Sequence, residues 1–247
     1  MGGQCIAVVS GKGGTGKTSL VSNVGAALAL TGRRVLCLDC DAGLRNLDLA
    51  LGLADQALMD YSDVIRGRCT LESAVVEHPK LPGLYLLTAP ARGNGGVSEG
   101  EMVLLLEQVR RSYDFCLLDA PAGLGPGVGL AVCGADRCIV VTTADATSLR
   151  DAQHTVMELN DFPNGALHLV VNRVSRKLLR NLHATIDDAI DRAGLPLLGV
   201  VPEDASLPLF LNQGLPLLPN GGRGASAAYR NIAKRILGER VPLVRMK

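Results

Sequence analysis

The chain has 247 residues, a net charge of +1 at pH 7, 3% aromatic residues and no tryptophan. This length suits one large α/β domain, expected over residues 1–247 with a tail from about residue 238. The near-neutral charge and the scarcity of aromatic side chains argue against nucleic-acid binding. No run approaches the roughly 18 apolar residues of a membrane span and no signal segment precedes the first strand, so we expect a cytoplasmic protein.

The first predicted strand, residues 5–9, runs into the segment SGKGGTGKT at residues 10–18. Gly11-x4-Gly16-Lys17-Thr18 fits a phosphate-binding loop between a strand and a helix. Its glycines let successive backbone N–H groups face one anion, and the helix that opens near Lys17 adds its positive end. Lys17 is expected on the β- and γ-phosphates and Thr18 on Mg²⁺; the alternative is a glycine-rich turn without a ligand. The predicted nucleotide-binding residues here are Gly11, Gly13, Gly14, Thr15, Gly16, Lys17, Thr18 and Ser19.

Lys12 is a second lysine in this loop, and it is not needed to hold a phosphate locally. It is either a solvated loop charge or a cation that reaches across a dimer interface to the partner's nucleotide, in the manner of an arginine finger.

A helix over residues 19–30, ended by Gly32, leads to a buried strand over residues 35–39. Continuous apolar strands that alternate with helices predict a doubly wound, mainly parallel sheet with helices on both faces. Asp39 and Asp41 would lie at the carboxyl edge of that sheet, beside the phosphate loop. Asp41 is the candidate for orienting the attacking water and as a metal ligand, and Asp39 for supporting the metal or the loop. Alternatively, both acids are loop and cap residues only.

Residues 55–78 predict two short helices, one capped by Thr70, before a strand over residues 84–88. Ser98-x-x-Glu101 is a capping box that opens the next helix. The strand over residues 115–119 ends in Asp119, which can hold a water of the Mg²⁺ shell, and Gly123 would let the following loop respond to the γ-phosphate.

In the last third, strands are predicted over residues 137–143, 167–171 and 197–201, with a helix capped by Thr147 after the first. Asn172 follows the second strand, where its amide could read the adenine edge or simply occupy a turn. A short helix over residues 205–212 precedes an amphipathic helix over residues 225–237, expected to dock on the sheet.

The seven cysteines are an odd number, and most lie in apolar runs. Cys37-x2-Cys40 has the spacing of a metal site, but no second close pair follows it. Buried, reduced thiols are the preferred interpretation.

Four segments in order, KGGTGKT, DxDxGLRNLDL, DAPAG and NIAKRILGERVP, resemble the MinD/ParA family of deviant P-loop ATPases over residues 5 to about 242. The resemblance implies a P-loop NTPase fold that forms a homodimer with ATP and Mg²⁺ and is reset by hydrolysis. It places Lys12 on the partner's phosphates and makes Asp41 the residue that positions water. It nominates Arg45, Asn46 and Asp48 for a partner-facing switch surface. It assigns Asn172, Arg173, Pro202, Glu203 and Asp204 to the base pocket.

The DxDxGLRNLDL segment favours the family members that act in division-site placement. This implies a MinC-like division inhibitor and a MinE-like or other topological-specificity protein as partners. A plasmid- or flagellum-positioning ATPase stays an alternative. So does an iron–sulphur electron-transfer protein of the same fold, which needs two cysteines per subunit near the dimer axis; Cys133 lies loosely in that region. Family members usually end in an amphipathic membrane helix, but only a short tail follows Gly238. Membrane association is therefore expected to be weak or indirect, at most peripheral at the inner face of the cell membrane.

Overall fold

The computed structural model describes residues 2–244 except positions 43, 92, 94, 124, 164, 176, 178, 181–184 and 218–222. Its sheet has the order β3-β4-β2-β5-β1-β6-β7-β8, and every described pairing is parallel except that of β3 with β4. The strands are β1 (Gln4–Val9), β2 (Val35–Asp39), β3 (Val76–Glu77), β4 (Leu84–Leu87), β5 (Phe115–Asp119), β6 (Arg137–Thr142), β7 (Leu167–Val174) and β8 (Leu197–Pro202).

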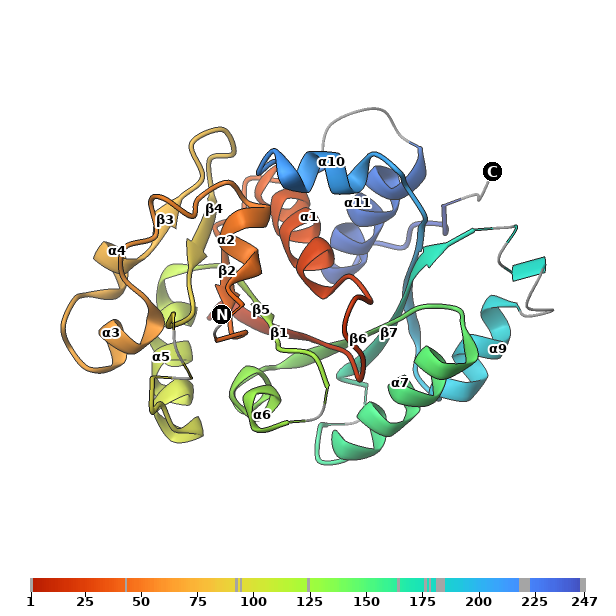
Figure 1. Cartoon of the computed structure of the whole chain (residues 1–247), viewed down its shortest axis with the longest axis horizontal. Helices are drawn as coiled ribbons and strands as arrows, with labels where there is room; N and C mark the ends of the chain where they lie inside the picture. The colour runs from red at the N-terminus through yellow and green to blue at the C-terminus, as the bar shows by residue number, and fades with distance from the viewer. Residues whose placement is uncertain are drawn as a thin grey trace.

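Helices cover both faces of this sheet (Figure 1). One face carries α1 (Lys17–Ala29), α2 (Asn46–Ala50), α10 (Leu207–Asn212) and α11 (Gly224–Ile236). The other carries α3 (Tyr61–Ile65), α4 (Leu71–Ala74), α5 (Glu99–Ser112), α6 (Pro126–Val132), α7 (Ala146–Glu158) and α9 (Ile186–Ala193). The doubly wound parallel architecture expected from the sequence is therefore confirmed.

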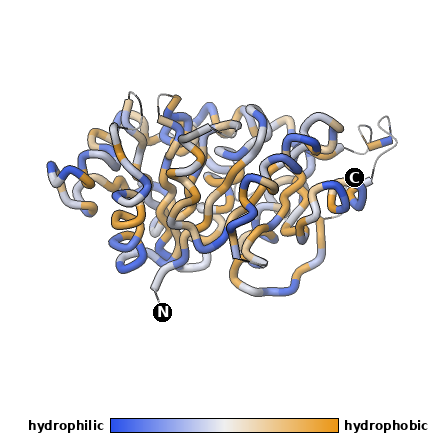
Figure 2. Tube along the Cα trace, turned by 90° about the horizontal axis from the view of Figure 1, so that it is seen from below, coloured by the Kyte–Doolittle hydropathy of each residue, from blue (hydrophilic) through white to orange (hydrophobic). Residues whose placement is uncertain are grey.

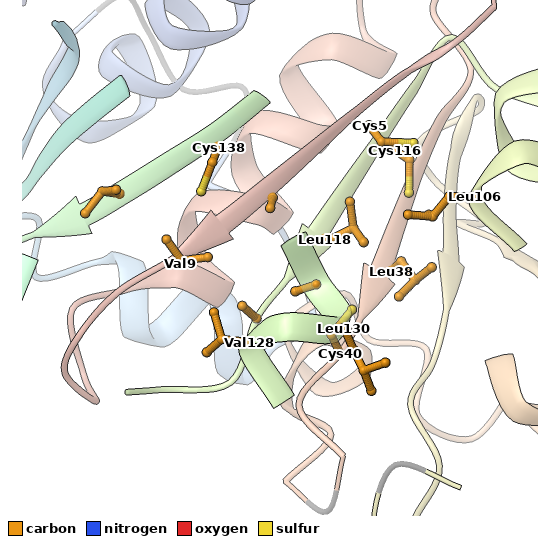
Figure 3. Close-up of a cluster of buried hydrophobic side chains, with 14 of the residues drawn as sticks. Cys5, Val9, Leu38, Cys40, Leu106, Cys116, Leu118, Val128, Leu130 and Cys138 are labelled. Carbon is orange, nitrogen blue, oxygen red and sulfur yellow. The ribbon is translucent and has the colours of Figure 1, made fainter. Parts of the chain in front are cut away.

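The central strands are buried on both sides because their side chains alternate between two cores. Cys5, Ala7 and Val9 of β1 pack under the α5–α7 side, whereas Ile6 and Val8 pack under α1 and α11. Figure 2 shows the hydrophobic residues concentrated along the central strands. Figure 3 shows part of the core on the α5–α7 side, called the first core below. Packing on both faces thereby holds the carboxyl ends of the strands in place, which positions the first residues after them.

The caps of Thr70 and Ser98 are confirmed: Thr70 accepts from the Ser73 N–H, and Ser98 forms a full capping box. The cap assigned to Thr147 is wrong, because Asp145 starts α7 by accepting from the Ser148 N–H at 3.0 Å. The Thr147 hydroxyl instead donates to Asp145. Strand β3 and helices α2, α6 and α9 are additions that the sequence did not predict.

The final helix docks on the sheet, as expected, with Tyr229 and Ile232 among its buried residues. The segment after it folds back along the helix. Asn231 donates to the Pro242 carbonyl at 2.9 Å, and Arg235 donates to the carbonyls of Leu198 and Val241 at 2.6 and 2.7 Å. The start of the tail, up to residue 244, is thus tied to α11 and β8, whereas residues 245–247 lie outside the described part.

Candidate functional site

The loop between β1 and α1 requires glycine at two positions, Gly16 for its backbone conformation and Gly11 for a close contact. Gly16 is the N-cap of α1 at φ 96°, a left-handed conformation that side chains rarely adopt. A Cβ on Gly11 would lie 2.5 Å from the Asp151 carbonyl oxygen of α7, so the loop rests directly on that helix. The tip of the loop, residues 12–14, is exposed. The backbone therefore forms an open cradle in front of the positive end of α1.

Lys17 points into this cradle and is buried, and its Nζ donates to the Ser10 hydroxyl at 2.9 Å. Burial lowers the pKa of Lys17, while Asp119 and Asp41 act in the opposite direction. Thr18 donates from Oγ1 to Asp119 Oδ2 at 2.6 Å, which joins the loop to the end of β5. The cradle thus has a cation and a hydroxyl already positioned beside a carboxylate.

Asp39 and Asp119 are register partners on β2 and β5, and both are buried. Burial raises the pKa of Asp119 to about 7 and that of Asp39 to about 6. The Asp39 oxygens accept from the Asp41 N–H at 2.8 Å and from the Leu47 N–H at 3.2 Å, so Asp39 holds the loop after β2. Asp119 Oδ1, by contrast, is buried without a partner and is available to a ligand.

Asp41 lies just beyond this pair and is only partly buried. Its pKa is raised by burial, and the positive charge of Lys17 acts against this shift. Lys12 is exposed on the loop tip. Both residues therefore stand where a group bound at the cradle would meet solvent.

Asn172 and Arg173 do not follow β7, as the sequence suggested, but form an irregularity within it. The pairing with β8 shifts register between Val171 and Val174, and Arg173 takes φ 57°. Asn172 thereby donates to the Thr15 carbonyl at 2.7 Å, while its Oδ1 is buried without a partner. Arg173 donates to the Gly14 carbonyl at 3.3 Å. Both residues are thus brought onto the phosphate loop.

A cavity of about 520 Å³ adjoins the loop tip. Glu203 is among its lining residues, whereas Asp204 instead accepts from the Ser206 N–H and hydroxyl and so shapes the turn before α10. Pro202 ends β8. The lining residues are Lys12, Gly13, Gly14, Thr15, Thr143, Asp145, Ser148, Arg173, Ser175, Lys177 and Glu203.

The residues nominated for a switch surface divide into inner and outer positions. Asp48 is buried and pairs with Arg45 at 3.2 Å, whereas Asn46 is exposed. Arg45 has φ 46° and is the N-cap of α2. Asp48 therefore fixes the loop from inside, while Asn46 faces outward.

Sequence reasoning missed Ser10 and Asp145. Ser10 holds Lys17 through its hydroxyl, and Asp145 both caps α7 and lines the cavity. A capping pattern at residues 145–148 could have identified Asp145, whereas no sequence pattern points to Ser10.

All seven cysteines are free thiols. Cys37 packs in the core under α1 and Cys40 in the opposite core, so the Cys-x2-Cys pair does not converge on one ion. Figure 3 shows Cys5, Cys40, Cys116 and Cys138 within the first core. Within the described residues, no group of three or more Cys, His, Asp or Glu side chains is arranged to hold a metal ion.

The model of the CobQ/CobB/MinD/ParA nucleotide binding domain matches residues 6–217. The septum site-determining protein MinD of Bacillus subtilis (strain 168) is 38% identical over 245 residues, covering 98% of this chain and 91% of the relative.

Solved structures are also similar over nearly the whole chain. The MinD cell division protein of Aquifex aeolicus superposes with a TM-score of 0.88 at 33% identity, covering 98% of this chain and 100% of that one. A chain of the MinC:MinD cell division protein complex of the same organism superposes with a TM-score of 0.90 at 34% identity, covering 98% of this chain and 99% of that one. The septum site-determining protein MinD of Pyrococcus horikoshii OT3, complexed with Mg-ADP, superposes with a TM-score of 0.81 at 29% identity, covering 94% of this chain and 95% of that one.

Proposed function

The chain belongs to the CobQ/CobB/MinD/ParA family of nucleotide-binding proteins, and on that premise we propose that it is a MinD-type ATPase acting in division-site placement. The observation that carries the proposal is the arrangement of Lys17, Thr18 and Asp119 around the glycine cradle, with Thr18 Oγ1 2.6 Å from the carboxylate. A lysine and a helix N-terminus favour a polyphosphate, which is the part of ATP that reacts.

The residues at the cradle fit a magnesium ion as well. Mg²⁺ prefers oxygen ligands, and the Thr18 hydroxyl and the unpartnered Asp119 Oδ1 supply them side by side. When bound, the ion would neutralise charge on the phosphate oxygens. Thr18 and Asp119 would hold it directly or through water, while Asp41 lies nearer the rim.

The adenosine would occupy the cavity beside the loop. Asn172 is the proposed base-reading residue because its Oδ1 is a buried acceptor without a partner, as the adenine amino group requires; it lies behind Thr15 and is not among the residues that line the cavity. Arg173 and Glu203 line the cavity, and Pro202 and Asp204 set the course of the chain past it.

Hydrolysis is assigned to Asp41, which aligns a water for attack on the γ-phosphorus, and Lys17 stabilises the charge that develops. Lys12 is exposed on the loop tip and is free to reach the nucleotide of a second copy. We therefore propose that ATP binding drives homodimerisation and that hydrolysis returns the monomer. The Aquifex relative is a partner of MinC, so a MinC-like inhibitor is the proposed partner, together with a MinE-like regulator.

One sample tests this proposal. Size-exclusion chromatography with ATP, with ADP and without nucleotide, followed by phosphate release, should show a dimer with ATP alone and slow turnover. A monomer under all three conditions, or turnover equal to that of buffer, would overturn it.

Membrane association through the tail is proposed to be weak for a single copy. Val244 packs against the core beside α11, and Val241 is tied to Arg235. No described helix is long and apolar enough to span a membrane. Strong co-sedimentation of the nucleotide-free monomer with anionic liposomes would contradict this.

A further inference from the structure

Two glycines far apart in sequence touch just after α2, the helix that follows the segment between β2 and α2, called the switch loop below. Gly52 follows α2 and Gly214 follows α10, with φ of 65° and 64°. A Cβ on Gly214 would lie 2.2 Å from the Gly52 Cα, and one on Gly52 would lie 2.8 Å from the Gly214 oxygen. The two backbones therefore meet without room for any side chain.

The segment that ends at Gly214 begins at the base side of the cavity. Glu203 lines the cavity, and Asp204 accepts from Ser206 at 3.0 Å (N–H) and 2.6 Å (hydroxyl). Helix α10 starts at the next residue, and its Phe210 accepts from the Leu215 N–H beyond Gly214 at 2.9 Å. Figure 1 shows α10 lying across α1 near α2. Hydrogen bonds thus fix this segment at both ends.

The chain just beyond Gly214 is hydrogen-bonded to α1, the helix that follows the phosphate loop. The Leu217 N–H donates to Asn23 Oδ1 at 2.6 Å, and Asn23 Nδ2 donates to the Ser19 carbonyl at 2.8 Å. Asn23 is fully buried. Segment 203–214 is therefore held against α1 through the residues that follow it.

On the other side of the contact, Gly52 is joined to the site through α2. The Gly52 N–H donates to the Leu49 carbonyl, the Leu47 N–H donates to Asp39 Oδ2 at 3.2 Å, and the Arg45 N–H donates to the Asp41 carbonyl at 3.2 Å. A shift of α2 would therefore move the backbone of Asp41.

We propose that the Gly52–Gly214 contact is a positioning contact through which the base-side segment 203–214 sets the place of α2 and of Asp41. The adenosine part of the nucleotide would then order the switch loop before any γ-phosphate acts on it. This inference rests on the proposed nucleotide binding. Gly52 and Gly214 are positioning residues, not catalytic ones.

Hydrogen exchange of the α2 amides tests the contact. In the wild type, Mg-ADP, which lacks the γ-phosphate, should slow exchange over residues 46–53 at least about fivefold, the lower end of typical coupling between sites. Mg-pyrophosphate, which fills only the phosphate loop, should not. Gly214→Ala should still bind ADP by calorimetry but lose the ADP response in residues 46–53.

Gly194→Ala is the matched control, because Gly194 has φ 65° and an added Cβ there would have nothing within 4 Å. It carries the same backbone strain and should respond as the wild type does. If Gly214→Ala does not fold, Gly52→Ala addresses the same contact from the other side. A wild-type ADP response in the glycine variant, or an equal response to pyrophosphate, would overturn the inference. Failure of the wild type to bind ADP at all would instead refute the proposed function.

Discussion

The two edges of the sheet treat charge in opposite ways. At the amino edge, Asp136 accepts from the Cys5 N–H at 2.7 Å and from Arg110 at 3.1 Å, and it is partly exposed. At the carboxyl edge, Asp39 and Asp119 are buried next to each other, and Asp119 Oδ1 has no partner. One edge is satisfied by the protein itself, whereas the other leaves acceptors for something else.

The difference shows that the carboxyl edge lacks hydrogen bonds that would stabilise the fold. A buried carboxylate without a full set of donors is unfavourable, and such groups persist where a ligand completes them. Arg34 at the amino edge, in contrast, lies 5.5 Å from the ring centroid of Tyr85 and 5.2 Å from that of Tyr113. Stabilising contacts and functional contacts are thus separated at opposite ends of the same strands.

The largest expected effect concerns the cation of the carboxyl edge. Lys17→Ala should lower ATP affinity by at least about 100-fold, about 2.7 kcal/mol, because the buried ammonium facing the phosphates is lost. Isothermal calorimetry measures it, with Lys80→Ala at an exposed turn as the control. Retained affinity would mean that Lys17 does not face the phosphates.

The next largest effect is expected for Asp41→Ala. This variant should bind ATP and dimerise, but it should hydrolyse ATP more than tenfold more slowly, which raises the activation free energy by at least about 1.4 kcal/mol. Only the group that orients water is removed. Phosphate release under single-turnover conditions gives the rate, and Asp55→Ala, an exposed acid in the same half of the chain, should behave as the wild type. A variant that keeps more than a tenth of the rate would exclude this role.

Lys12→Ala should leave ATP affinity within about threefold of the wild type and prevent the ATP-dependent dimer, since Lys12 lies exposed at the rim of the cavity and not among the buried residues that face the phosphates. Size-exclusion chromatography with light scattering distinguishes the species. If the variant dimerises normally, Lys12 is only a solvated charge.

The sequence predicted the phosphate loop and the aspartates at the strand ends because these features are local. It did not predict α2, whose five residues are held by Asp39 and by the left-handed Arg45 rather than by helix propensity. Nor did it predict the irregularity that turns Asn172 onto Thr15, or the Gly52–Gly214 contact, which joins segments far apart in the chain. Such features depend on tertiary packing that overrides local preference.

The wrong choice of Thr147 over Asp145 has a more local cause. Both residue types cap helices, and the two positions differ by less than one turn. The Asp145 carboxylate accepts from the Ser148 N–H and from the hydroxyls of Thr143 and Thr147, so three donors selected it.

The comparison of edges also predicts a pH dependence. Asp119 and Asp39 have folded pKa values of about 7 and about 6, above the unfolded value near 3.9, so the folded protein holds protons more tightly. Their contribution to the free energy of unfolding is therefore complete below about pH 4 and is lost as the pH rises through 7. Asp119→Asn should reduce the loss between pH 5 and 8 by at least about 1.4 kcal/mol in nucleotide-free protein. Urea unfolding at each pH measures it, Asp114→Asn is the control, and equal slopes would contradict it.

The smallest effect is expected at the amino edge, where a substitution should change stability and leave ATP affinity unchanged. Asp136→Ala removes the acceptor of the Cys5 N–H and of Arg110, and should lower the free energy of unfolding by about 1 kcal/mol. The effect is small because the Asp136 side chain is 43% exposed and water replaces part of the lost interactions. ATP affinity should stay unchanged, because the site lies at the other end of the strands. Urea unfolding and calorimetry on the same preparation test both halves, and a loss of ATP affinity would show that the two edges are not independent.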